Sequence, residues 1–152
     1  MTVSISSIDA IGSDLKGLSD GNSQLADKLL RTITQGLYAQ MSLRIFNIDG
    51  SQKADGSLIG AYNPQYYKQR VKRFGRTEKN VSLMATDQMH SAFGWGAGAN
   101  DTYVIGFDNK LAADKSMWNE ERFGNIFSLS QSEIDSISPI VSEFMQENFG
   151  NK

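Results

Sequence analysis

Three tyrosines between residues 62 and 67 are followed by six basic residues between 68 and 79, and their chemistry suits contact with an acidic partner. Cations neutralise phosphates and aromatic rings stack on bases, so residues 68–79 could form a nucleic-acid-binding module. The same charges could instead lie in solvent or face an acidic protein surface. Because the whole chain has a formal net charge of −2, we favour the second interpretation. The candidate partner-binding residues are Tyr62, Tyr66, Tyr67, Lys68, Arg70, Lys72, Arg73 and Arg76.

Residues that could support catalysis are few. The chain has no cysteine and a single histidine, His90, which follows Asp87 at helical spacing. An Asp–His pair without an activated nucleophile is not a catalytic triad. We therefore expect no hydrolase, and no enzyme, and interpret His90 as a packed or surface imidazole.

Two glycine-containing stretches have some features of ligand-binding loops. Asp49 to Gly56 has the spacing of part of a calcium loop, but Lys53 stands at a ligand position and no glutamate closes the pattern. Residues 94–101 are rich in glycine but lack the Lys-Ser/Thr pair of a phosphate-binding P-loop. We expect no bound metal and no cofactor.

Length and composition limit the class of protein. At 152 residues the chain is one domain by length and can bury a real core without disulfides. Residues 1–18 lack the basic start and continuous apolar run of a signal peptide. No window approaches the roughly 20 apolar residues that span a bilayer. The expectation is a protein made in a cytoplasm, with no membrane partner.

The N-terminal half predicts an arm followed by a long helix. Residues 1–21 are rich in serine, glycine and aspartate, which predicts a flexible or partner-bound N-terminal arm. From Asn22 or Ser23, apolar residues recur at every fourth position and predict one core helix of about 25 residues. Residues 22–152 then form a single domain, with an extended loop or arm at about 47–80 that begins with turn dipeptides.

The C-terminal segment predicts a helix, a strand and a helix with almost no loop between them. Gly124 ends a helix over residues 112–122, and the apolar run Ile126–Leu129 predicts one buried strand. Ser130 and Glu133 have the spacing of a capping box that begins the final helix. Pro139 should bend or restart that helix because it lacks a backbone N–H.

These elements together predict an α+β fold. The long N-terminal helix and the C-terminal helix pack on a small, mainly antiparallel sheet with strands at about 81–83, 93–98, 102–107 and 126–129. Thr86 is a candidate N-cap for a short helix, and residues 100–101 lie near a hairpin turn. Five apolar residues should be buried together: Leu29, Ile33, Leu37, Phe127 and Ile137.

Three blocks in the second half also carry a family resemblance. In chain order they are Val81–Phe93, Tyr103–Phe107 with the helix that ends at Gly124, and Ile126–Glu133. Their order and spacing resemble the virion-morphogenesis and tail-completion family of tailed bacteriophages, together with the neck proteins that share its fold. Asp87 stands where the family has glycine, and the family's loop tryptophan and proline–alanine–arginine–proline run are absent.

The resemblance implies a structural virion protein with no catalytic residue. Such a protein would form a homo-oligomeric ring, as a neck or tail-completion component joining the portal-connector to the tail. The alternative within the resemblance is a tail terminator ring. The implied partners are further copies of the chain and the portal, connector and tail proteins, with packaged DNA nearby. The implied location is the virion, assembled in the host bacterial cytoplasm.

Overall fold

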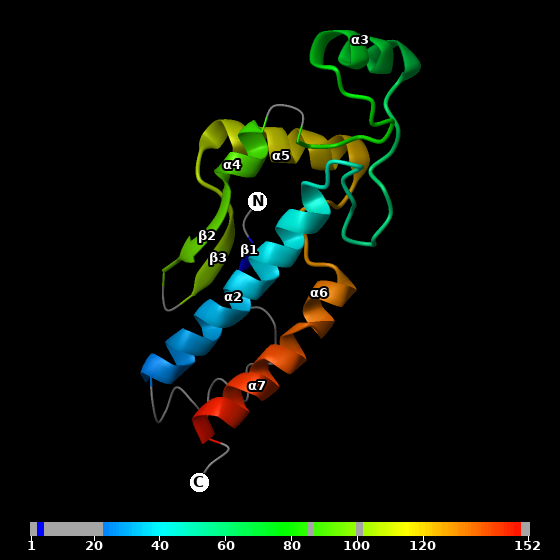
Figure 1. The fold of residues 1–152 in the computed structure, drawn as a ribbon. Helices are drawn as coiled ribbons and strands as arrows, with labels where there is room; N and C mark the ends of the chain where they lie inside the picture. The colour runs from blue at the N-terminus through cyan, green and yellow to red at the C-terminus, as the bar shows by residue number, and fades with distance from the viewer. Residues whose placement is uncertain (1–2, 5–22, 85–86, 100–101, 150–152) are drawn as a thin grey trace.

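The computed structural model describes residues 3–4, 23–84, 87–99 and 102–149, and they form an α+β fold. The long helix α2 (Ser23–Ile45) lies between a small antiparallel sheet and the C-terminal helix α7 (Ile137–Phe149), and it contacts both (Figure 1). The predicted α+β architecture, with its long N-terminal helix and its C-terminal helix, is confirmed.

The helix α2 carries the core along one side. Its apolar residues at every fourth position are completely buried: Leu29, Ile33, Leu37, Met41 and Ile45. Phe127 and Ile137 join the same cluster, so the five residues predicted to be buried together do lie in one core. Asn22, one of the two predicted N-caps, lies outside the described residues.

The sheet has three strands in the order β1-β3-β2. The hairpin of β2 (Phe93–Ala97) and β3 (Tyr103–Phe107) was predicted, and the structure pairs Trp95 with Ile105 in it. Its predicted turn at 100–101 lies outside the described residues. The strand β1 (Val3–Ser4) pairs with the other edge of β3. It belongs to the predicted N-terminal arm, of which residues 5–22 are not described.

Two predicted strands are wrong, and their backbone groups explain why. Around Ile126 the amides of residues 126 and 127 donate to the Glu120 carboxylate at 3.1 and 2.9 Å, so they are not free for a strand partner. The amides of residues 81–83 donate to loop residues that are distant in sequence, among them the Val81 N–H to the Gly60 carbonyl at 2.7 Å and the Leu83 N–H to the Ser51 hydroxyl at 2.9 Å. Ile126 and Phe127 are nevertheless buried, as the apolar run predicts.

The C-terminal helices lie close to their predicted positions, although the helix before Gly124 begins at Lys110 and not at residue 112. Asn109 caps α5 (Lys110–Phe123), and Gly124, with a φ of 92°, follows its last residue. Ser130 and Glu133 form the predicted capping box of α6 (Gln131–Asp135). Ser136 separates α6 from α7, and Pro139 lies in the first turn of α7, where a missing N–H leaves no helix bond unmade. The predicted restart of the final helix is confirmed.

One arginine joins four parts of the fold. The Arg44 guanidinium donates to both carboxylate oxygens of Glu133, at 2.7 and 3.1 Å. It also donates to the carbonyls of Gln52, Ile126 and Ser128, at 3.2, 2.9 and 2.8 Å. A guanidinium has five N–H donors, so every one is used. The end of α2, the loop after it, the 124–130 segment and α6 are thereby held together.

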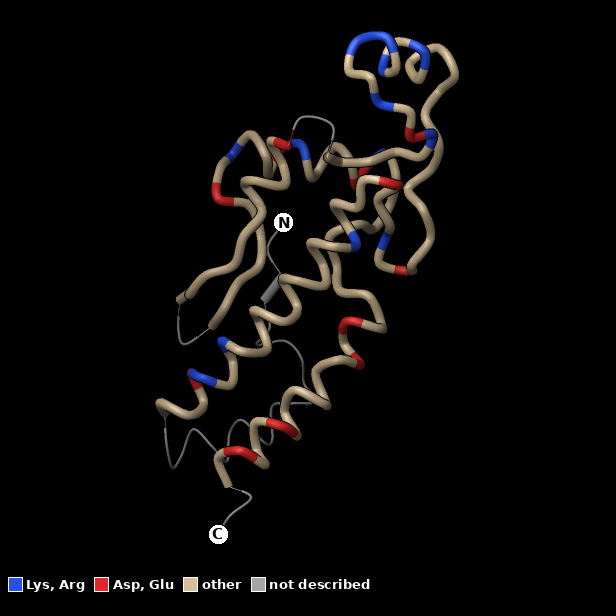
Figure 2. The backbone as a smooth tube through the Cα atoms, in the orientation of Figure 1, with Lys and Arg blue, Asp and Glu red and all other residues tan. Residues whose placement is uncertain are grey.

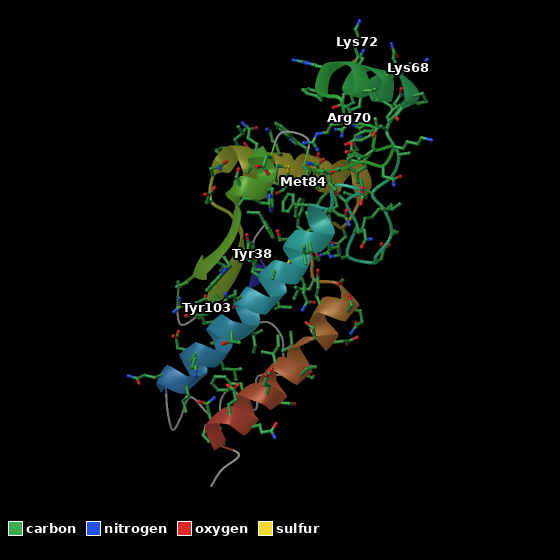
Figure 3. The ribbon with its side chains drawn as sticks, in the orientation of Figure 1. Tyr38, Lys68, Arg70, Lys72, Met84 and Tyr103 are labelled. Carbon is green, nitrogen blue, oxygen red and sulfur yellow. The ribbon has the colours of Figure 1, made fainter. Side chains whose placement is uncertain are left out.

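Two tyrosines connect the sheet to α2 (Figure 3). Tyr38 donates its hydroxyl to the Phe93 carbonyl at 3.3 Å and stacks on the Phe93 ring. Tyr103 donates to the Asp27 carboxylate at 2.7 Å, and this hydrogen bond raises the pKa of Tyr103. The sheet is therefore fixed to α2 both at the middle of the helix and near its start.

We expect Phe127→Ala to lower the free energy of unfolding by about 3–5 kcal/mol, because the ring is buried and packs edge-on against Phe107. Phe74→Ala is the matched control, since that ring is 51% exposed and its loss should change stability by about 0.5 kcal/mol or less. Chemical denaturation measures both. Equal, small losses would contradict the described core.

Candidate functional site on the basic arm

The basic residues lie on a projecting segment, residues 61–80, which we call the basic arm. It leaves the body beyond the end of α2 and holds the helix α3 (Pro64–Phe74) away from the other helices (Figure 1). The arm was predicted as an extended loop, and its helix was missed. Its signals were in the sequence: Asn63 caps the helix, Pro64 occupies the first turn and Gly75 ends it with a φ of 64°.

The two ends of the basic arm run side by side. Ala61 forms a bridge with Asn80, and the Tyr62 N–H donates to the Lys79 carbonyl at 3.0 Å. Closer to α3, the Tyr67 hydroxyl donates to the Thr77 carbonyl at 3.1 Å. These bonds close the arm into a stalk with a helical tip.

The tip is built around Arg70. The side chain of Arg70 is 1% exposed, and its guanidinium lies 4.3 Å from the centre of the Tyr62 ring. Glu78 is its ion-pair partner at 3.5 Å. The Nε and one terminal nitrogen of Arg70 make no hydrogen bond, and neither does the facing carboxylate oxygen of Glu78. Arg70 therefore stabilises the arm from inside and is not free to meet a partner, unlike the exposed Lys68, Lys72 and Arg73.

The other cations of the arm surround this centre. Lys68 and Lys72 point away from the body, whereas Arg70 points back toward the stalk (Figure 3). Lys68, Lys72, Arg73 and Lys79 are exposed, and Arg76 is half-buried. Within the described residues none of these five forms an ion pair. Figure 2 shows the result, a tip marked by Lys and Arg.

The aromatic residues of the arm are mostly engaged in the arm itself. The Tyr62 ring is covered by Arg70, and its hydroxyl donates to the Ser82 carbonyl while accepting from the Ser82 N–H. Tyr66 leans on the Tyr62 ring and remains 46% exposed. Two further apolar side chains, not singled out from the sequence, are exposed on α3: Val71 and Phe74. The surface is therefore a mixture of cations and apolar groups.

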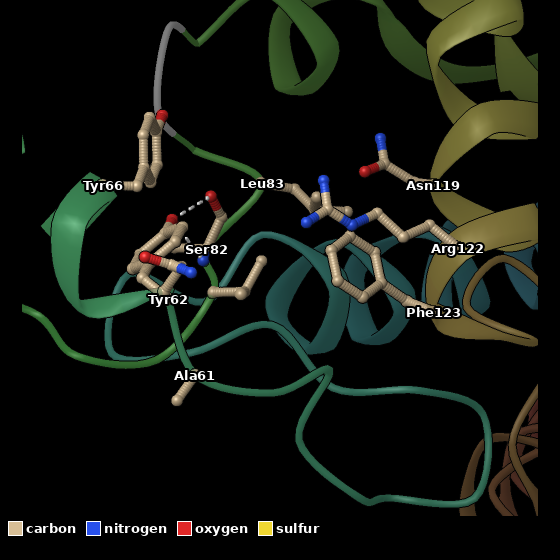
Figure 4. Close-up of a pocket in the computed structure, with 10 residues that line it drawn as sticks. Ala61, Tyr62, Tyr66, Ser82, Leu83, Asn119, Arg122 and Phe123 are labelled. Atoms are coloured by element: carbon tan, nitrogen blue, oxygen red, sulfur yellow. Dashed lines mark hydrogen bonds between the residues drawn. The ribbon is translucent and has the colours of Figure 1, made fainter.

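A cleft of about 450 Å³ lies between the base of the arm and α5 (Figure 4). Tyr62, Tyr66 and Ser82 form its arm side, and Asn119, Arg122 and Phe123 form its α5 side. Arg122 adds a cation to this otherwise mixed apolar and amide lining. The cleft extends the basic arm surface onto the body.

The Asp87–His90 pair lies elsewhere, at the short helix α4 (Gln88–Ala92). His90 Nδ1 lies 3.1 Å from the Asp87 carboxylate, and its ring packs against Phe46. Asp87, with a φ of 55°, stands at the helix start, while Thr86, the predicted cap, lies outside the described residues. The nearby Ser91 hydroxyl donates to backbone carbonyls of residues 87 and 88, not to the imidazole. The imidazole of His90 is therefore packed against Phe46 and bonded to Asp87, as expected for a structural histidine.

Other site types find no support in the described part of the chain. No three histidine or carboxylate side chains gather there in a way that could hold a metal ion. None of the described helices has the length and apolar character needed to cross a membrane. The chain has no significant match among protein-family models, curated proteins or solved structures.

We expect Arg70→Ala to loosen the basic arm alone. Loss of the stacked guanidinium should raise amide exchange rates across residues 62–79 about tenfold and leave α2 unchanged. Lys72→Ala is the control, because that side chain lies in solvent. Hydrogen exchange read by mass spectrometry resolves both regions. Exchange that rises equally in α2, or not at all in the arm, would contradict this role.

Proposed function

We propose that this chain is a structural virion protein of a tailed bacteriophage, a neck or tail-completion component that forms a ring between the portal-connector and the tail. The observation that carries the proposal is the basic arm, a projecting and fully described segment on which every cation except Arg70 lacks an ion pair and on which Tyr66, Val71 and Phe74 are exposed. A projecting segment with unpaired charges and exposed apolar side chains is suited to contact with a neighbouring macromolecule. The order of the three sequence blocks supports the identity of the neighbour as another virion protein.

The helix α5 gives the protein a second face suited to neighbours. Leu111, Met117 and Trp118 are each more than half exposed on that helix. Large apolar side chains grouped on a surface mark contacts with other proteins. A ring subunit placed between two other assemblies needs a face for those proteins in addition to its contacts with further copies. The exposed face of α5 can meet that additional need.

The geometry of the arm favours a protein partner over nucleic acid. Single strands are held by rings on which the bases stack. Here the Tyr62 ring is covered by Arg70, and the hydroxyls of Tyr62 and Tyr67 are bonded within the arm and to its base. Duplex binding through phosphates needs only the cations, so it remains the alternative that an experiment should separate.

A binding assay separates these two functions. We expect DNA binding no tighter than about 1 µM at physiological salt, the level of non-specific attraction. Fluorescence anisotropy with short single-stranded and duplex DNA measures it across a salt series. The comparison variant reverses Lys68, Lys72, Arg73 and Arg76 to glutamate and keeps Arg70, because Arg70 holds the arm together. Tight, salt-sensitive binding that this variant loses would replace the structural role with a nucleic-acid-binding one.

Deletion of the gene from the phage tests the virion role itself. We expect the deletion to leave filled heads and separate tails, and a plasmid copy to restore joined, infective particles. Electron microscopy of the lysate, with labelled antibody against the chain, shows the heads, the tails and the site of the protein. Joined and infective particles without the chain would rule the role out.

A further inference from the structure

We propose that the basic arm of one copy docks on the acidic helices α6 and α7 of the next copy, so that the chain associates head to tail. The inference rests on the proposed ring and specifies its subunit contact. It follows from two surfaces of opposite charge at different places on the same molecule (Figure 2).

The donor surface is the outer face of α3. Lys68 and Lys72 lie one turn apart on this face and point into solvent, with Val71 beside them at 36% exposed. Arg70 occupies the opposite, buried face and fixes which side of the helix is presented. Residues 61–80 contain six lysines and arginines against one acidic residue, Glu78, which already faces Arg70. The positive charge of the arm is therefore not balanced within the arm.

The acceptor surface is the outer face of α6 and α7. Residues 124–149 contain four acidic residues and no lysine or arginine. Glu133 is buried against Arg44, whereas Asp135, Glu143 and Glu147 are exposed. Within the described residues none of these three forms an ion pair, and Lys28, which lies over the Phe144 ring, leaves the face acidic.

The two surfaces agree in spacing and in apolar content. Lys68 and Lys72 on α3, like Glu143 and Glu147 on α7, are four residues apart, which is about 6 Å along a helix axis. Exposed Val71 and Phe74 on the arm can meet exposed Phe149, which lies two residues beyond Glu147 on α7. The arm and the far end of α7 lie at opposite ends of the molecule (Figure 1), so one copy cannot satisfy its own charges.

A contact between two different surfaces is heterologous. Repeating it adds further copies in the same sense, and the assembly closes into a ring when the rotation between copies divides a full turn. The acidic helices of the last copy then receive the arm of the first. This symmetry is what a ring between a portal and a tail requires.

Reversing each surface separately tests the contact. One variant carries Lys68→Glu and Lys72→Glu, and the other carries Glu143→Lys and Glu147→Lys. We expect the wild-type chain to self-associate with rising concentration in sedimentation velocity, and each variant alone to associate about tenfold or more weakly. An equimolar mixture of the two variants should recover association, because each reversed surface then finds its complement. A folding defect could not produce that recovery.

The control variants carry Lys53→Glu or Glu121→Lys, each of which reverses one charge outside both surfaces, and they should associate as the wild type does. Wild-type association that neither reversal weakens would overturn the contact while leaving the ring itself intact. A wild-type chain that stays monomeric at every concentration, or a mixture that recovers nothing, would also overturn it. None of these results decides the virion role, which the gene deletion tests independently.

Discussion

The fold depends on the buried ion pair between Arg44 and Glu133, in which every N–H donor of the arginine side chain makes a hydrogen bond. Arg44 and Glu133 have side chains that are 9% and 3% exposed, so both charges have left water. Removing charges from water is costly unless the pair and its other hydrogen bonds replace the lost solvation. Arg44 makes its five bonds, and Glu133 also accepts the Ser130 N–H at 2.7 Å. The 124–130 segment can therefore be irregular and still be fixed in place.

A second arginine plays a weaker version of the same part in the basic arm. Arg70 is also buried, yet it depends on the Tyr62 ring and a long ion pair, and two of its nitrogens lack hydrogen bonds. No apolar side chain of residues 61–80 is buried. Local unfolding of the arm should therefore require less free energy than unfolding of the rest of the protein. The network around Arg44 therefore keeps α6 in place, whereas the arm can change its conformation at a lower cost in free energy.

Much of the fold outside the basic arm could be predicted from the sequence because its signals are local. Apolar spacing located α2, the hairpin followed from β-branched and aromatic residues, and Ser130 with Glu133 marked the start of α6. The helix α3 was missed although its signals, Asn63 and Gly75, are local. The wrong strand prediction at residues 126–129 has a non-local cause. The apolar run at Ile126 predicts a strand, but Glu120 and Arg44 take its backbone groups, and no local pattern reveals such partners. In the candidate site the sequence identified the cations. It did not reveal the burial of Arg70, because that depends on Tyr62, which precedes α3 in the chain, and on Glu78, which follows it.

A double-mutant cycle at Arg44 and Glu133 tests the central claim, that this pair holds the end of α2, the 124–130 segment and α6 together. Glu133→Gln removes the charge and keeps a side chain able to complete the capping box, and Arg44→Met removes the guanidinium with similar volume. Each single change should cost about 3–5 kcal/mol of unfolding free energy, and the double variant should cost less than their sum by about 1–3 kcal/mol. If each single variant lost about 1 kcal/mol or less of unfolding free energy, and the double variant lost only their sum, the fold would not depend on this pair.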